Sequence, residues 1–199
     1  PGAGGSSKGR FTEPIQAGVL ARKQFHLDDR RARRAYIVFY MMQSDPAREP
    51  APYYLVVNGI RIAGKTPSWH EPAWRWVEVP TSLLKRGLNE VIVGSDAPAG
   101  KGYDLLFARE DEYEDGGGKY TYQDNTAMIC ADQIRLGETK VLAGLKPIQV
   151  GATSAKSTDR GKTWIKGKLG PHSDVTGEYT IRLNLERFKG VVADVLGST

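Results

Sequence analysis

Three of the four tryptophans of this sequence lie close together in the segment Trp69–Trp76, with a histidine, a glutamate and an arginine among them. Indole rings can stack on the C–H faces of sugar rings, while charged side chains hydrogen-bond the sugar hydroxyl groups. The segment therefore predicts a carbohydrate-binding loop. Either Trp74 or Trp76 could instead fill a hydrophobic core. We expect the ligand residues to be Trp69, His70, Glu71, Trp74 and Arg75, joined by Tyr103 from a second group of aromatic residues.

A cluster of carboxylates follows further along the chain, directly before three glycines at residues 116–118. Carboxylate oxygens are the ligands that Ca²⁺ prefers in proteins. The expected ligands of a structural calcium are Asp111, Glu112, Glu114 and Asp115. Their spacing differs from that of an EF-hand loop, so a solvated acidic loop is the alternative.

Motifs for catalysis are missing from the sequence. The histidines, His26, His70 and His172, are far apart and form no zinc-binding pair. There is no Gly-x-Ser-x-Gly nucleophile motif, no phosphate-binding glycine loop and no motif that pairs two carboxylates. Cys130, the only cysteine, excludes an internal disulfide and a multi-cysteine metal site. The sequence therefore favours a protein without catalytic activity.

Basic residues are concentrated in the last third of the chain, which supplies most of the net charge of +5. This part could attract an anionic polymer, or it could form a solvated lysine-rich hairpin. A second basic run, residues 30–34, follows two aspartates and leads into a strand, which favours paired charges. Nucleic-acid binding is not expected, because the aromatic and basic clusters lie in different parts of the chain. The basic cluster of the last third, described first above, comprises Lys156, Arg160, Lys162, Lys166 and Lys168.

No apolar stretch of the sequence approaches the length of a membrane span.

Runs of β-branched and aromatic residues between Gly, Pro and Asn predict an all-β sandwich. The pair Asn58-Gly59 between two apolar runs predicts a two-residue hairpin, because both turn positions need a positive φ. The unbroken apolar run 35–42 predicts a central strand that is buried on both faces. Residues 81–87 predict one capped helical turn that ends at a glycine. The expected strands are residues 35–42, 53–57, 60–62, 74–79, 88–93, 103–108, 126–131, 179–185 and 191–196.

Residues 53–93 resemble the galactose-binding-domain-like superfamily. The segments Tyr54–Gly59, Trp76–Pro80 and Leu83–Val91 match its "VNG" hairpin, its "W-x-x-x-VP" strand and its "LLK-x-G-x-N" turn, in this order. The resemblance implies a jelly-roll β-sandwich. It also implies a sugar-binding or structural role, because the superfamily includes carbohydrate-binding modules and the accessory domains of glycoside hydrolases and polysaccharide lyases. In many members the loop that corresponds to Trp69–Trp76 carries ligand residues.

Residues 157–164 resemble a single Asp-box, the S-x-D-x-G-x-T-W hairpin of sialidases. The resemblance implies that side-chain oxygens bind turn amides, that the glycine adopts a positive φ and that the tryptophan packs beneath the loop. Sialidases carry several such boxes, one in each propeller blade, and the residues after Glu138 are too few for a propeller. A structural hairpin is therefore expected, without sialidase activity. The residues of the motif are Ser157, Asp159, Gly161, Thr163 and Trp164.

The sequence predicts a flexible linker at residues 1–10, a sandwich at 11–140 and an Asp-box β-segment at 141–199. The last segment either packs on the sandwich or begins a second β module. The expected function is a non-catalytic carbohydrate-binding or accessory module of a secreted bacterial polysaccharide-active enzyme, in the periplasm or outside the cell. The expected partners are an oligo- or polysaccharide and a catalytic domain of the same or a neighbouring protein. The alternatives are a structural interaction domain without sugar binding, and a β-sandwich polysaccharide lyase or glycoside hydrolase.

Overall fold

Short antiparallel strands make up most of the computed structural model, which describes residues 12–27, 29–45, 52–63, 73–109 and 153–186. A single 3₁₀ turn, η1 (Thr81–Leu83), is the one helical element within these ranges. The expected strands 126–131 and 191–196 lie outside the described residues. The strands are β1 (Thr12–Ile15), β2 (Leu20–Leu27), β3 (Arg34–Gln43), β4 (Tyr53–Val57), β5 (Ile60–Ala63), β6 (Ala73–Val79), β7 (Gly87–Ser95), β8 (Tyr103–Arg109), β9 (Ser154–Ser157), β10 (Ile165–Lys166), β11 (Lys168–Leu169), β12 (Val175–Tyr179) and β13 (Ile181–Glu186).

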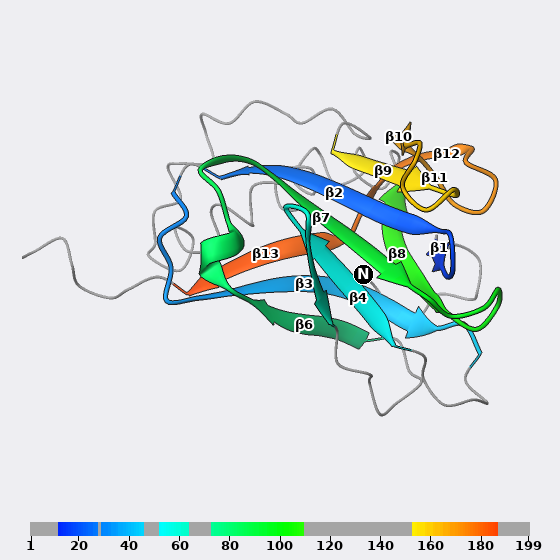
Figure 1. Ribbon diagram of the computed structural model, residues 1–199. Helices are drawn as coiled ribbons and strands as arrows, with labels where there is room; N and C mark the ends of the chain where they lie inside the picture. The colour runs from blue at the N-terminus through cyan, green and yellow to red at the C-terminus, as the bar shows by residue number, and fades with distance from the viewer. Residues whose placement is uncertain (1–11, 28, 46–51, 64–72, 110–152, 187–199) are drawn as a thin grey trace, which may run out of the picture.

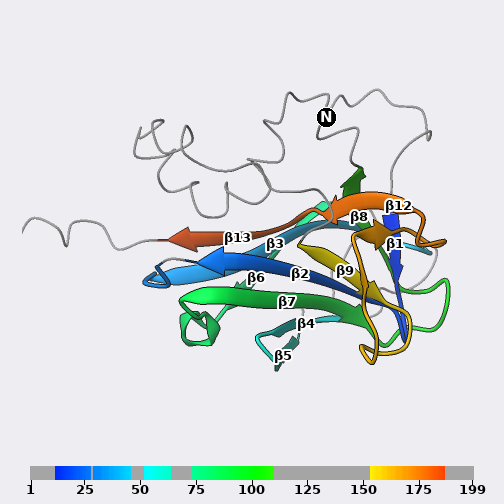
Figure 2. The ribbon, with the colours of Figure 1, turned by 90° about the horizontal axis from the view of Figure 1, so that it is seen from above.

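These strands form two antiparallel sheets that stack face to face, as an all-β sandwich requires (Figures 1 and 2). The six-stranded sheet has the order β10-β9-β2-β7-β4-β5. The seven-stranded sheet has the order β11-β12-β8-β3-β13, with β1 paired to β8 and β6 paired to β3. Alternate side chains of both sheets point inward and form one continuous core, which includes Leu55 and Val93 from one sheet and Phe39 and Leu183 from the other. The two sheets therefore stabilise each other by burying one face each.

The predicted hairpin at Asn58-Gly59 is confirmed. Strands β4 and β5 pair antiparallel on either side of it, and Val57 lies opposite Ile60. Asn58 has a φ of 49° and Gly59 a φ of 88°, the left-handed values that a type I′ turn needs. The turn type is thus set by two adjacent residues that tolerate this backbone conformation.

A pair of asparagine side chains fastens this hairpin to the start of β7. The Asn58 amide nitrogen donates to the Leu83 carbonyl at 2.7 Å and to the Asn89 side-chain oxygen at 2.9 Å. Asn89 is fully buried; its oxygen also accepts from the Lys85 N–H, and its nitrogen donates to the carbonyls of Lys85 and Gly87. Asn89 therefore satisfies backbone groups of the turn that no strand partner reaches.

The prediction of a capped helical turn at residues 81–87 is wrong in two respects. Only Thr81–Leu83 form a 3₁₀ turn, Leu84 is already extended, and the side chain of Pro80 provides no cap. Gly87 does have the expected positive φ of 94°, but it begins β7 instead of ending a helix. The Asn89 side chain instead binds the backbone of this segment, at the Lys85 N–H and at the carbonyls of Lys85 and Gly87.

The predicted central strand 35–42 is confirmed as β3, which pairs with β6, β13 and β8. The expected burial on both faces is only partly correct. Side chains of the inner face are buried, but Tyr36, Tyr40 and Met42 on the outer face are half-buried. Only Val38 is buried on that outer face, because it lies between Trp76 of β6 and Arg182 of β13 in the strand register.

The expected strand 179–185 is divided in two by Thr180. Strand β12 before it pairs with β8, whereas β13 after it pairs with β3. The Thr180 amide and hydroxyl both donate to the Leu106 carbonyl, at 3.1 and 2.9 Å. The chain thus exchanges one strand partner for the next at this residue.

The C-terminal strands belong to both sheets of the sandwich. Strand β9 pairs with β2 in the six-stranded sheet, and β12 and β13 lie in the seven-stranded sheet. Strands β1, β2 and β9 were not among those expected from the sequence. Each carries a charged residue at a buried position, namely Glu13, Lys23 and Lys156.

One buried ion pair joins β2 to β12. The Lys23 ammonium lies 2.8 Å from the Glu178 carboxylate, and the two side chains are 0% and 1% exposed. Glu178 also accepts hydrogen bonds from the Thr153 N–H and hydroxyl and from the Ser154 hydroxyl. The two charges balance each other, and the carboxylate oxygens of Glu178 are hydrogen-bonded. The pair therefore meets the conditions under which burial of two charges is tolerated.

A second buried pair joins β9 to β1. The Lys156 ammonium lies 3.1 Å from the Glu13 carboxylate and donates to the Gly170 carbonyl. Glu13 also accepts from the Gly170 N–H at 2.7 Å and from the Tyr179 hydroxyl at 3.2 Å. Burial, and then the nearby Glu13 carboxylate, raise the pKa of Tyr179 well above 10.0, so its hydroxyl stays protonated and donates.

Acid should weaken the link between β2 and β12. Burial alone would raise the Glu178 pKa, but the charge and hydrogen bond of Lys23 and the hydrogen bonds of Ser154 and Thr153 together lower it below its ordinary 4.5. As the pH falls, the unfolded chain therefore binds this proton before the folded chain does, so the stabilisation is complete above about pH 5 and is lost below it. We expect the free energy of unfolding, measured by urea titration with tryptophan fluorescence, to fall between about pH 5 and pH 3.

The matched control for this acid effect is the double variant Lys23→Met with Glu178→Leu. It lacks the titrating carboxylate and should show a shallower fall over the same pH range. Equal pH slopes in the two proteins would assign the acid sensitivity to other carboxylates.

Candidate functional site

The outer face of the seven-stranded sheet carries an aromatic surface. Strand β6 alternates, so Arg75 and Val77 point inward while Trp74 and Trp76 point outward. Trp74 is 42% exposed and Trp76 is 57% exposed. The alternative that one of these tryptophans fills the core is therefore wrong. We define the aromatic platform as Tyr36, Tyr40, Trp74 and Trp76.

The platform rings hold one another in place across the β3–β6 pair. Tyr40 lies directly opposite Trp74 in the register, and their ring centroids are 5.4 Å apart with an interplanar angle of 73°. Tyr36 contacts Trp76 at 6.0 Å and 69°. Such edge-to-face pairs restrict side-chain rotation, so little conformational entropy remains to be lost when a ligand binds.

Polar side chains border the platform. The Arg182 guanidinium, on β13, lies 5.0 Å from the centroid of the Trp74 ring. Arg34 approaches Glu78 at 3.9 Å and the Tyr36 hydroxyl at 3.5 Å. Asn184, half-buried, lies opposite Tyr36 on β13. The arrangement combines exposed rings with guanidinium, carboxylate and amide groups, which suits a polyhydroxylated ligand that has apolar faces.

Only part of this surface was expected from the sequence. Trp74 was named, but Tyr36, Tyr40 and Arg182 were not, because the apolar run of β3 indicated burial on both faces. A usable signal was present: tyrosine recurs at even positions of the run, and a tyrosine on an outer sheet face can keep its hydroxyl in water.

Arg75 and Tyr103, two of the expected ligand residues, lie in the interior. Arg75 is 6% exposed and Tyr103 is 0% exposed. The Tyr103 ring packs edge-to-face on Tyr53 at 5.6 Å. Burial, reinforced by Tyr53 and opposed by the charge of Arg75, raises the Tyr103 pKa to about 12. Neither side chain lies on the surface that carries Trp74.

The other expected ligands fall outside the described residues. These are Trp69, His70 and Glu71 in the predicted carbohydrate loop, and Asp111, Glu112, Glu114 and Asp115 in the predicted calcium site. Within the described ranges, no group of three or more His, Cys, Asp or Glu side chains is arranged to hold a metal ion.

The turn between β9 and β10 contains the hydrogen bonds that its motif predicted. The Ser157 hydroxyl accepts from the Gly161 N–H at 2.8 Å, and Asp159 accepts from the Thr163 N–H at 2.9 Å and from the Thr163 hydroxyl at 2.7 Å. These bonds, above all that of the Thr163 hydroxyl, lower the Asp159 pKa to about 2. Gly161 has the expected positive φ of 84°, and the half-buried Trp164 ring lies 4.3 Å from the Arg22 guanidinium.

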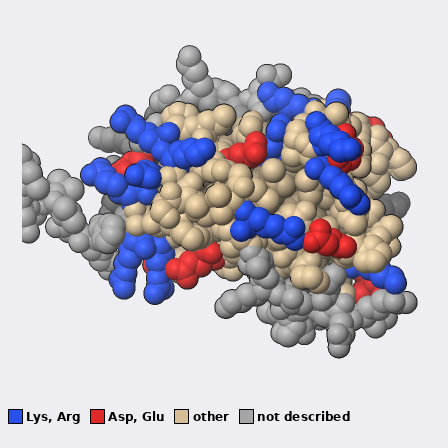
Figure 3. Space-filling model, in the orientation of Figure 1, with Lys and Arg blue, Asp and Glu red and all other residues tan. Residues whose placement is uncertain are grey.

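The basic residues do not form one surface. Lys156 is buried with Glu13, while Lys162, Lys166 and Lys168 are exposed. On the face shown in Figure 3, basic side chains lie in several separate groups with acidic side chains between them. Just before β3, the Arg31 guanidinium donates to both oxygens of Asp29, and Arg30 donates to the Leu84 carbonyl. Within this second basic run, Arg31 thus has the charged partner that the sequence context favoured, whereas Arg30 binds a backbone carbonyl.

Comparisons with known proteins do not identify a relative that shares this geometry. In the described part of the chain, no helix has the length and apolar character needed to cross a membrane. No family model, no curated protein and no solved structure matches the chain.

Proposed function

We propose that this protein is a non-catalytic carbohydrate-binding module whose glycan stacks on the aromatic platform. The observation that carries this proposal is the pair of exposed indole rings of Trp74 and Trp76, held by Tyr40 and Tyr36. Two residues on one strand are about 7 Å apart, so an extended chain of sugar units could cover both rings. The resemblance of residues 53–93 supports a jelly-roll scaffold of the galactose-binding type.

The polar border supports a glycan over a purely apolar partner. Arg182, Arg34, Glu78 and Asn184 surround the rings with donors and acceptors that sugar hydroxyl groups can use. An exposed aromatic surface could also bind another protein. A flat apolar partner, however, would leave these charged groups without water or a hydrogen-bond partner, at a cost in free energy. The proposed setting is a secreted bacterial polysaccharide-active enzyme, whose catalytic domain the module accompanies.

Removing either indole should weaken glycan binding. We expect Trp76→Ala and Trp74→Ala each to reduce affinity about tenfold or more, because each removes a stacking surface near the centre of the site. The measurement is affinity electrophoresis against a panel of soluble neutral and acidic polysaccharides. The predicted ligand residue Trp69 is tested in the same way through Trp69→Ala.

The matched control is Leu88→Ala, which removes an exposed apolar side chain from the six-stranded sheet. It should leave retention unchanged. If wild-type protein binds a glycan and the two indole variants are retained equally well, the platform is not its binding site. If no polysaccharide is retained, a structural interaction domain without sugar binding becomes the better interpretation.

A further inference from the structure

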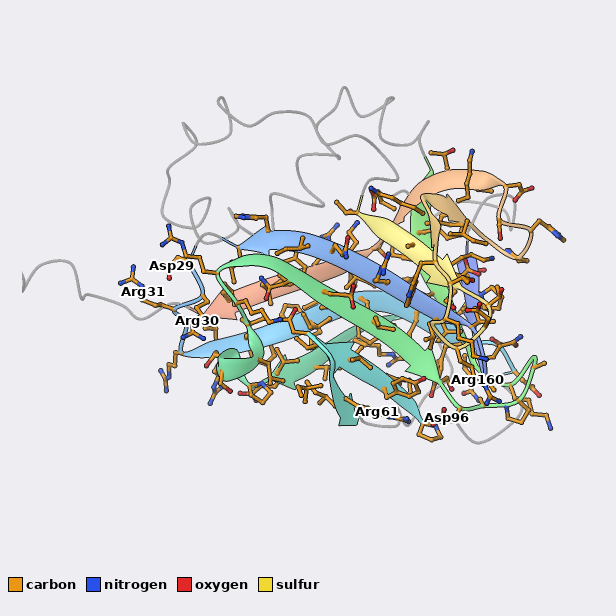
Figure 4. All side chains as sticks on the ribbon, turned by 45° about the horizontal axis from the view of Figure 1, so that its top comes forward. Asp29, Arg30, Arg31, Arg61, Asp96 and Arg160 are labelled. Atoms are coloured by element: carbon orange, nitrogen blue, oxygen red, sulfur yellow. The ribbon has the colours of Figure 1, made fainter. Side chains whose placement is uncertain are left out.

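The outer face of the six-stranded sheet, opposite the aromatic platform, contains a pocket of about 370 Å³. It is lined by Ala17, Gly18, Leu20, Tyr54, Asp96 and Arg160. Figure 4 shows Asp96 and Arg160 near Arg61 at one end of the sandwich. The volume of this pocket is at the lower end of the range for small-molecule sites, which is enough for a single sugar-sized molecule.

Tyr54 and Asp96 both contact neighbouring residues of the pocket, and the side chain of Arg61 touches each of them. Tyr54 lies across Gly94, where an added Cβ would come within 2.5 Å of the tyrosine ring. The Arg61 guanidinium lies 3.7 Å from the centroid of the same ring and 2.7 Å from the Asp96 carboxylate. Glycine at position 94 thus makes room for Tyr54, and Arg61 holds both pocket residues. These contacts limit the number of side-chain arrangements in this part of the wall.

Arg160 lines the pocket from the turn between β9 and β10 and is exposed to solvent. Its φ is 64°, a left-handed value that few residues other than glycine and asparagine adopt readily. The turn holds it there, because the Arg160 N–H donates to the Gly18 carbonyl at 3.1 Å and Ser157 binds the neighbouring Gly161. An arginine at a position that suits glycine or asparagine points to a use for its side chain.

The charge of Arg160 is not balanced within the pocket. Among the described residues, no hydrogen bond or ion pair involves its guanidinium. Asp96, the acidic residue of the lining, is already paired with Arg61. The pocket therefore favours a ligand with a negative group, which an arginine can bind through two parallel hydrogen bonds. The free acceptor capacity of Asp96 and the Tyr54 hydroxyl suit ligand hydroxyl groups.

We propose that this pocket binds one hydroxylated carboxylate of monosaccharide size, which is the chemistry of a hexuronic acid. The carboxylate binds Arg160, and the hydroxyl groups bind Asp96 and Tyr54. The site lies on the other sheet from Trp74 and Trp76, so it does not depend on glycan binding by the platform.

The test is isothermal titration of the full chain with galacturonate and glucuronate, and with galactose as the neutral comparison. We expect binding of a uronate in preference to galactose. Arg160→Asn should weaken that binding about tenfold or more, because it removes the guanidinium. Asparagine tolerates the left-handed backbone, so the turn is retained. The control Lys162→Asn removes an exposed cation from the same turn outside the pocket and should change affinity less than twofold.

A digalacturonate titration distinguishes a free uronate from a unit at the end of a chain: tighter binding of the dimer indicates the chain end. Trp76→Ala should leave uronate affinity unchanged, so failure of the platform proposal would not affect this one. The pocket proposal is overturned if galactose binds as well as the uronates, if neither uronate binds, or if Arg160→Asn binds a uronate as tightly as the wild type.

Discussion

Replacing Lys23 by methionine should lower the free energy of unfolding by about 3–5 kcal/mol, the range found when a buried ion pair loses one partner. Lys23 and Glu178 are 0% and 1% exposed and 2.8 Å apart. The variant leaves the Glu178 carboxylate buried without its counter-charge. The Thr153 and Ser154 hydrogen bonds remain, but they cannot neutralise it.

Urea unfolding at pH 7, followed by tryptophan fluorescence, measures this loss. The double variant Lys23→Met with Glu178→Leu should recover most of it, because two apolar side chains of similar size need no counter-charge. Arg31→Met is the exposed control. It breaks the Asp29–Arg31 pair at the surface and should leave the free energy of unfolding nearly unchanged. If Lys23→Met were no more destabilising than Arg31→Met, the buried pair would contribute little to stability.

Replacing Asn89 by alanine should cost about 2–4 kcal/mol, because it leaves several part-buried backbone groups of the turn without partners. Its side chain accepts from the Lys85 N–H and from Asn58, and donates to the carbonyls of Lys85 and Gly87. Water cannot readily replace these bonds, since Asn89 is fully buried. The loss should appear in the same urea titration.

Two further variants separate the bonds of Asn89 from its volume. Asn89→Asp keeps the size of the side chain but loses both donated bonds, so it should also be strongly destabilised. Asn184→Ala removes a half-buried asparagine on β13 and should stay within about 0.5 kcal/mol of the wild type. A mild effect of both Asn89 variants would show that the turn rearranges to satisfy its own backbone.

The Asn58–Asn89 contact explains why residues 53–93 have a recognisable pattern. Asn58, Gly59 and Asn89 fasten a hairpin to the next strand, and Leu84 is buried in the core. These residues stabilise the scaffold and lie away from the aromatic platform. The pattern is therefore informative mainly about the fold, because Trp76 is the one platform residue in its three matched segments, whereas Tyr36, Tyr40 and Trp74 lie outside them.

Strands with a plain alternation of apolar and polar residues were predictable. Strands β4, β6, β7 and β8 were found close to their expected bounds, because the inward positions of each carry mainly apolar side chains. Strands β1, β2 and β9 were missed, because Glu13, Lys23 and Lys156 occupy inward positions and read as exposed residues. A charged residue at an inward position interrupts the alternation of apolar and polar residues. The strand is therefore not recognised from the sequence unless the partner of that charge is known.

The candidate site was predictable only in part for a similar reason. That Trp74 and Trp76 share one face follows from the period of two along a strand. Which face meets water does not follow from β6 alone, because it depends on where the second sheet packs. Tyr36 and Tyr40 join the platform only through the pairing of β3 with β6.

The sequence by itself determined the local features of this protein: the Asn58-Gly59 hairpin, the alternating strands and the hydrogen-bonded turn at residues 157–164. Each depends on φ values, side-chain period or hydrogen bonds within a few residues. Only the tertiary structure decided that Lys23 is buried, that both platform tryptophans face outward and that Arg160 meets Tyr54 in one pocket. Lys23 and its partner Glu178 are 155 residues apart, and a contact between such distant residues is specified by the packing of the whole sandwich.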